Sequence, residues 1–161
     1  MDLYKGFRLG GAASKVVPII HVLSKLGLLF SLLLAVPTLM SYFYHDSAFF
    51  VFAYTALTVL LVSCVTWVLT LRFNRELRPR DGFTLVLMLW LAFAIVAAMP
   101  IYFYMPSMSF TDAFFEAMSG LTTTGATVIS GLDTLDPSVN FWRHMLNWLG
   151  GMGIIVLAVA I

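Results

Sequence analysis

Four long apolar stretches separate the polar positions of this chain. They run from Ile19 to Tyr42, from Ala48 to Leu71, from Phe83 to Met105 and from Trp142 to Ile161. A helix of about 20 apolar residues crosses the hydrocarbon core of a bilayer, so each stretch predicts a membrane-spanning helix. We therefore expect an all-α membrane protein that crosses the bilayer several times.

Composition supports this prediction and excludes other classes of protein. Hydrophobic residues make up 61% of the 161 residues and charged residues 11%, whereas soluble domains carry about 25% charged residues. The net charge of +1 argues against a nucleic-acid partner, because phosphate binding needs a dense basic surface. The single cysteine, Cys64, excludes a disulfide within one chain.

The positions of lysine and arginine predict the orientation in the membrane. The N-terminal arm carries Lys5, Arg8 and Lys15, and the loop at positions 72–80 carries four arginines. Cytoplasmic loops are enriched in these residues, so the N-terminus and this loop are expected in the cytoplasm, where anionic lipid is a natural partner. Residues 1–82 are thus interpreted as an arm, a transmembrane hairpin and a basic cytoplasmic loop.

The segment between the third and fourth stretches is different, because it is too polar to span a membrane. Residues 109–120 read as a short helix that Ser109 or Thr111 can cap. Such a helix reaches only about half-way through a bilayer. Residues 83–161 are therefore interpreted as a unit with an outward helix at 83–105, this half-helix, a non-helical loop at 122–127 and an inward helix at 142–161.

The loop after the half-helix has the chemistry of a cation filter. Potassium filters replace the hydration shell of the ion with rings of backbone carbonyls, and a threonine-rich strand with a glycine suits this. Gly125 can adopt a positive φ that turns successive carbonyls toward an ion path. From the residues alone, an ordinary buried loop is an equal alternative, although the place after a half-helix favours the filter.

Five polar residues around the half-helix and the fourth stretch allow two interpretations each. Acidic side chains at the outer mouth would concentrate cations, whereas an acidic residue in the first turn can simply cap the helix. Polar residues at the start of the fourth stretch would attract cations or, as we favour, anchor the loop by hydrogen bonds. The acidic pair is Asp112 and Glu116, and the other three residues are Arg143, His144 and Asn147.

Two sequence strings, FFEAMSGLTTTGATV and WRHMLNWLGGMGIIVLAVAI, resemble the first pore loop and the following helix of the Trk family of potassium-uptake subunits, the TrkH and TrkG type. The resemblance implies four helix, pore-loop, helix repeats around one ion path, with one glycine per repeat. Gly125 falls on that glycine, and Thr122, Thr123 and Thr124 fall on the residues beside it. It implies that K⁺ is bound by the backbone carbonyls of Thr123 and Thr124 as the transported ion, with no cofactor.

The same resemblance implies a bacterial inner-membrane location, pairing of two full-length chains and a cytoplasmic, nucleotide-binding regulatory subunit of the TrkA type. Three further repeats are not seen in this sequence. We expect that the chain is a piece of a protein roughly three times longer, since Ile161 ends an apolar run without a basic anchor. Assembly of four copies is the alternative.

Two other functions are alternatives to ion transport. An intramembrane hydrolase with His144 as its base has no recognisable nucleophile motif and no residue to orient the histidine, so no enzyme activity is expected. A non-conducting structural or accessory membrane subunit would suit the first two helices. It would leave the half-helix and the threonine-glycine loop unexplained.

Overall fold

The computed structural model describes residues 13–73 and 79–160 of the chain. Over these ranges every regular element is a helix, so the expectation of an all-α protein is confirmed. The elements are α1 (Ala13–Tyr44), α2 (Phe49–Thr70), a 3₁₀ turn η1 (Leu71–Phe73), α3 (Pro79–Tyr104), α4 (Phe110–Leu121), a second 3₁₀ turn η2 (Leu132–Thr134) and α5 (Pro137–Ala160).

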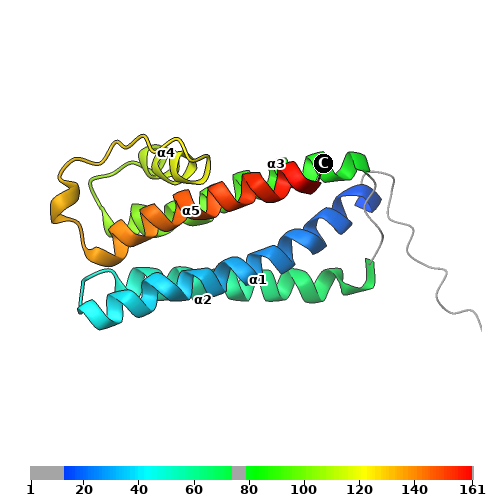
Figure 1. Cartoon of the computed structure of the whole chain (residues 1–161). Helices are drawn as coiled ribbons and strands as arrows, with labels where there is room; N and C mark the ends of the chain where they lie inside the picture. The colour runs from blue at the N-terminus through cyan, green and yellow to red at the C-terminus, as the bar shows by residue number, and fades with distance from the viewer. Residues whose placement is uncertain (1–12, 74–78, 161) are drawn as a thin grey trace, which may run out of the picture.

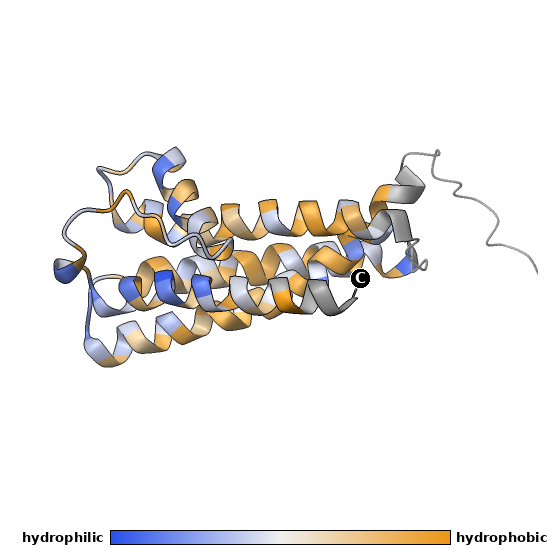
Figure 2. Cartoon of the chain, turned by 45° about the horizontal axis from the view of Figure 1, so that its top comes forward, coloured by the Kyte–Doolittle hydropathy of each residue, from blue (hydrophilic) through white to orange (hydrophobic). Residues whose placement is uncertain are grey.

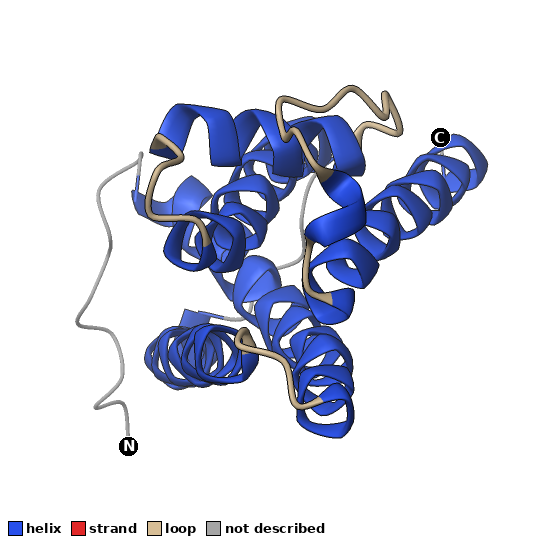
Figure 3. Cartoon of the chain, turned by 90° about the vertical axis from the view of Figure 1, so that its left-hand side faces the viewer, coloured by secondary structure: helices blue, strands red, loops and turns tan. Residues whose placement is uncertain are grey.

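The four long helices run side by side, and the short α4 lies against α3 and α5 (Figure 1). An end-on view shows the hairpin of α1 and α2 on one side and the other helices opposite (Figure 3). The α1–α2 turn, the end of α3 and the start of α5 lie at one end of the bundle, which we call the turn end. The chain enters α4 from the turn end and returns there after it.

Within the described ranges, three helical segments are long and apolar enough to cross a membrane: Val16–Tyr44, Phe49–Thr70 and Gly82–Tyr104. Colouring by hydropathy shows apolar residues along these helices and polar residues gathered toward the ends (Figure 2). Large apolar side chains such as Leu32 and Leu69 are more than 60% exposed, which suits lipid rather than water. The fourth predicted span falls within α5, which is not among the three segments.

Two helix starts show how the local sequence sets the element boundaries. Ser109 caps α4, because its hydroxyl accepts a hydrogen bond from the Asp112 amide at 3.1 Å. α5 begins at Pro137, earlier than the predicted start at Trp142. Proline suits the first turn of a helix, since its missing N–H has no partner there in any case. The Asp136 carbonyl accepts from the amides of Val139 and Asn140, which continues the helix.

Trp142 joins the hairpin to the rest of the bundle. Its side chain is fully buried and meets the rings of Phe30 in α1 and Phe52 in α2 edge-on, at centroid distances of 5.8 and 6.1 Å. Its indole Nε1 donates to the Ala97 carbonyl of α3 at 3.1 Å. One α5 side chain therefore fixes the mutual positions of four helices near the turn end.

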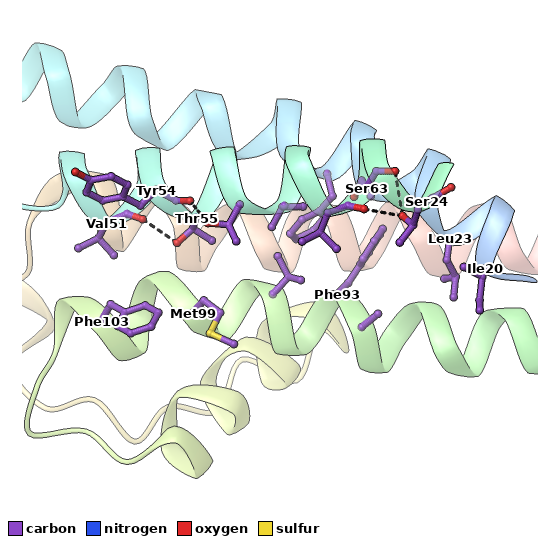
Figure 4. A pocket seen from close by; sticks show the side chains of 18 of the residues that line it. Ile20, Leu23, Ser24, Val51, Tyr54, Thr55, Ser63, Phe93, Met99 and Phe103 are labelled. Carbon is purple, nitrogen blue, oxygen red and sulfur yellow. Dashed lines mark hydrogen bonds between the residues drawn. The ribbon is translucent and has the colours of Figure 1, made fainter. Parts of the chain in front are cut away.

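Away from Trp142, the hairpin and α3 are separated by an apolar groove of about 960 Å³ (Figure 4). Val51, Tyr54 and Thr55 of α2 line one wall, and Phe93 and Phe103 are among the α3 residues on the other. The Thr55 hydroxyl donates to the Val51 carbonyl of its own helix at 2.8 Å. The Thr55 hydroxyl is thus already paired within its own helix and does not donate across the groove.

α5 approaches the end of α4 so closely that only glycine fits. A Cβ added at Gly150 would lie 1.9 Å from the carbonyl oxygen of Leu121, whereas a Cβ at Gly151 would meet nothing closer than 3.8 Å. Gly150 therefore makes room for the end of α4. Its missing side chain lets the backbone of α5 support the C-terminal end of α4.

We expect Gly150→Ala to lower the melting temperature of the detergent-solubilised protein, because the clash with a backbone atom forces α4 and α5 apart. Overpacking of this kind costs about 1–3 kcal/mol. Gly151→Ala is the matched control, since it makes the same change in helix propensity one residue away with ordinary contacts. Equal melting temperatures for the two variants would contradict the close approach.

Candidate functional site

The site begins where α4 ends, part-way along the bundle (Figure 1). α4 has 12 residues, which at 1.5 Å per residue make about 18 Å, little more than half the thickness of a hydrocarbon core. Ala113 and Ala117 are fully buried on its inner face, and Gly120 lies against Leu146 of α5. Small residues thus let this half-helix pack tightly against α5 and present its C-terminal end to the following loop.

Ser119 folds the chain back at the end of α4. Its carbonyl accepts hydrogen bonds from the amides of Thr124 at 2.9 Å and Gly125 at 3.3 Å. Its hydroxyl donates to the Ala126 carbonyl at 2.7 Å. Sequence reasoning missed this residue. The available signal was a hydroxyl directly before the glycine near the helix end, but a serine there is equally typical of simple helix packing.

The backbone of the loop is unusual at two alternate residues. Gly125 has a φ of +71°, so the expected positive φ is confirmed, and Thr123 has a φ of +57°. A β-branched residue in this region is a genuine outlier, and such conformations cost on the order of 1–3 kcal/mol. The rest of the structure must therefore hold the loop in this shape.

The residues from Thr122 to Gly125 are exposed. Within the described part of the chain, no protein group donates a hydrogen bond to any of their four backbone carbonyls. The hydroxyls of Thr122 and Thr124 lie 2.8 Å apart, and the Thr122 hydroxyl also donates to the Met118 carbonyl. The predicted filter residues therefore carry four carbonyl acceptors that no described protein group pairs, directly after the end of a helix.

A buried ion pair holds the far side of this loop. Arg143 of α5 contacts Glu116 of α4 through Nε at 2.7 Å and Nη2 at 2.5 Å, both to Oε1. The other carboxylate oxygen accepts from the Thr127 hydroxyl at 3.0 Å and from the Val128 amide at 3.1 Å. The side chain of Glu116 is only 3% exposed. The Glu116 carboxylate of α4 therefore joins α5 to the loop.

The other predicted residues lie outside this network or at its margin. Asn147 donates to the Arg143 carbonyl at 3.3 Å, one turn along α5. Asp112 is exposed in the first turn of α4, where it accepts a hydrogen bond from the Ser109 hydroxyl at 2.7 Å. His144 is exposed, and the described residues give it no hydrogen bond. The structure thus brings together Glu116, Arg143 and the loop, but not Asp112 or His144.

The arrangement can bind a cation without side-chain charges at the binding surface. No group of three or more histidine, cysteine, aspartate or glutamate residues that could hold a metal ion occurs in the described ranges. Carbonyl and hydroxyl oxygens are the ligands that hard cations prefer. The fold and the site together define a multi-pass, all-α membrane protein in which a short helix lies against two long ones and is followed by an exposed loop with free carbonyl oxygens.

Comparison with known proteins gives the family. Residues 48–161 match the model of the TrkH family, described as cation transport protein, and the chain belongs to this family. It is 44% identical over 144 residues to the Trk system potassium uptake protein TrkH of Salmonella typhimurium, covering 89% of this chain and 30% of that protein. It is 37% identical over 149 residues to TrkG of Escherichia coli, covering 92% of this chain and 31% of that protein.

A solved structure agrees with the fold. The crystal structure of the potassium transporter TrkH from Vibrio parahaemolyticus superposes with a TM-score of 0.83 at 43% identity, over 90% of this chain and 31% of that one. The chain therefore spans about 30% of the length of the relatives it matches. Because the family is one of cation transport proteins, the hydrolase hypothesis with His144 as base is set aside.

We expect Glu116→Gln to destabilise the protein, because Arg143 then keeps a buried charge without a partner. Breaking a buried pair in this way costs about 3–5 kcal/mol. The double variant Glu116→Gln/Arg143→Gln should be less destabilised than the sum of the two single variants, as thermal unfolding in detergent will measure.

Asp112→Asn is the matched control, because it removes an exposed carboxylate from the same helix. Its effect should stay within about 1 kcal/mol. Additive losses in the double variant would show that the two buried side chains do not act as a pair.

Proposed function

We propose that this chain supplies one of four selectivity-filter segments of a potassium-uptake protein. The observation that carries the proposal is the exposed segment from Thr122 to Gly125, whose four carbonyls accept no hydrogen bond from the described protein. Backbone carbonyls can replace the water molecules around K⁺. In this proposal the ion is held chiefly by the carbonyls of Thr123 and Thr124.

The half-helix supports a cation at this position electrostatically. A helix carries a partial negative charge at its C-terminal end, and α4 ends at Leu121, directly before the filter segment. Half-helices that end part-way across a membrane use the same effect to bind cations. The strained φ of Thr123 also favours a functional loop, because a segment without such a role has no need for this conformation.

The family supports potassium as the substrate and a larger pathway around this segment. The relatives are named as potassium uptake proteins, and the family resemblance implies four repeats around one path. Residues 83–161 then form the first repeat, with α3 as its outward helix, α4 and its loop as a re-entrant pore loop, and α5 as its inward helix. The remaining repeats come from the rest of the protein.

The membrane location of the protein and its partners are part of the same proposal. The basic residues of the N-terminal arm and of the 72–80 loop favour a cytoplasmic N-terminus in a bacterial inner membrane. The turn end then faces the outside, where Asp112 adds negative potential. Two full-length chains are inferred to pair, and a nucleotide-binding TrkA-type subunit to regulate them from the cytoplasm.

Glu116 and Arg143 serve the filter in this proposal without touching the ion. Their contacts fix Thr127 and Val128, the second and third residues after the filter segment. The alternative function is a non-conducting structural or accessory subunit of the membrane. It accounts for the hairpin, but gives no reason for an ion pair that holds a strained and exposed loop.

We expect Gly125→Ser to lower the preference for rubidium over sodium in uptake by proteoliposomes containing the protein encoded by the complete gene. The structure leaves open space where a side chain would project, so the change acts on the backbone and on the oxygen ligands. The matched control is Gly131→Ser, because Gly131 has a similar φ of +74° outside the filter segment. It carries the same backbone strain and should keep the ion preference.

An unchanged preference in Gly125→Ser would reject the filter assignment. An accessory subunit predicts that neither variant changes the ion preference and that the protein alone supports no flux.

A further inference from the structure

Two aspartates bind the turn of the hairpin to the start of α5. Each accepts hydrogen bonds from a serine of the other segment. Asp46 of the turn accepts from the Ser138 amide at 3.1 Å. Asp136, directly before α5, accepts from the amide of Ser47 at 2.9 Å and from its hydroxyl at 2.6 Å. We call these four residues the clasp. Each carboxylate thus reaches across to the other segment.

Asp46 is held in its charged form. Burial alone would raise the pKa of Asp46, but hydrogen bonds from the Ser41 hydroxyl and from the amides of Ser138 and Ala48 outweigh it and lower the pKa below its ordinary value. The group is therefore ionised at neutral pH. Both aspartates lie at helix N-termini, of α2 and of α5, where a negative charge is favourable.

The clasp adds polar contacts at the turn end to the apolar core that the hairpin shares with α3 and α5. The apolar groove separates α2 from α3 along much of their length (Figure 4). Trp142 and the clasp lie on the same side of this separation, at the turn end. The clasp and the ring contacts of Trp142 thus both tie the hairpin to the first two turns of α5.

Those two turns of α5 lead directly to the filter loop. Arg143 donates to the Asn140 side chain at 3.3 Å and to Glu116 at 2.7 Å. Glu116 in turn accepts from Thr127 and Val128. A continuous series of hydrogen bonds and one rigid helix start therefore connects the hairpin turn with the loop.

We propose that Asp46 and Asp136 are positioning residues for the filter loop, so that the α1–α2 hairpin contributes to ion selection without lining the ion path. This proposal rests on the proposed function of the loop. In this proposal the clasp fixes the rotation of α5 about its axis and its position along that axis. α5 in turn positions the Arg143 side chain, and the Arg143–Glu116 pair fixes the conformation of the loop. A hairpin that only anchors the protein in lipid would not need such a connection.

The test uses Asp46→Asn/Asp136→Asn in the protein encoded by the complete gene, reconstituted in proteoliposomes. We expect the rubidium-to-sodium uptake ratio to fall about threefold, within the range of couplings carried by packed helices. Amide hydrogen exchange should also speed up in residues 122–130, several of whose amides are hydrogen-bonded. Ser47→Ala removes a single hydrogen bond of the clasp and should change both readouts in the same direction, but less.

The matched control is Asp133→Asn, which removes an exposed carboxylate from the same loop without touching the clasp. It should leave the uptake ratio and the exchange rates unchanged. An equal fall of the ratio in this control would assign the effect to the general negative potential and overturn the proposal. Faster exchange confined to residues 45–48 and 136–140, with an unchanged ratio, would show a purely structural clasp and also overturn it.

Gly125→Ser measured in parallel separates this inference from the function on which it rests. When Gly125→Ser changes the uptake ratio and the clasp variants do not, the filter assignment stands and the positioning role falls. When Gly125→Ser leaves the ratio unchanged, the filter assignment falls. Hydrogen exchange of residues 122–130 then decides alone whether the clasp positions the loop.

Discussion

The buried pair of Glu116 and Arg143 is the interaction on which the site depends. Two charges removed from water are costly, and they remain only where geometry and further hydrogen bonds compensate. Here the carboxylate meets two guanidinium nitrogens on one side and two loop donors on the other. Because Glu116 lies in α4 and Arg143 in α5, the pair forms only when both helices and the loop are in place. It therefore makes the shape of the loop a consequence of helix packing.

Helix packing in turn depends on residues that hold α5 at a fixed position. Trp142 contacts α1, α2 and α3 through two rings and one hydrogen bond, and Gly150 lets the α5 backbone touch the end of α4. Both residues lie within two turns of Arg143, one before it and one after. Arg143, whose side chain holds the loop through Glu116, is thus fixed on both sides along α5. Because the loop is held in this way, the strained φ of Thr123 can persist.

The sequence predicted the helices well because apolar length is a strong signal in a membrane protein. It also predicted a cap by Ser109 or Thr111, of which Ser109 is the one observed, together with the short α4 and the positive φ of Gly125, since capping and glycine chemistry act locally. It did not predict the start of α5 at Pro137, because the apolar stretch that marks this helix begins only at Trp142. Ser119, the Glu116–Arg143 pair and the clasp join residues from different turns or elements, so no spacing in the sequence could reveal these contacts.

The unpaired carbonyls of residues 122–125 follow from how the loop satisfies its other polar groups. The amides of Thr122, Thr123, Thr124 and Gly125 all bond carbonyls at the end of α4, and the Ala126 carbonyl takes the Ser119 hydroxyl. The amide donors of residues 122–125 are thereby paired, whereas their carbonyl acceptors remain without a donor in the described protein. At membrane depth such acceptors are tolerated only beside water, ions or further protein. A loop with its donors paired and its acceptors free favours a cation over an anion, so the half-helix and its hydrogen bonds already determine the sign of the charge that this segment attracts.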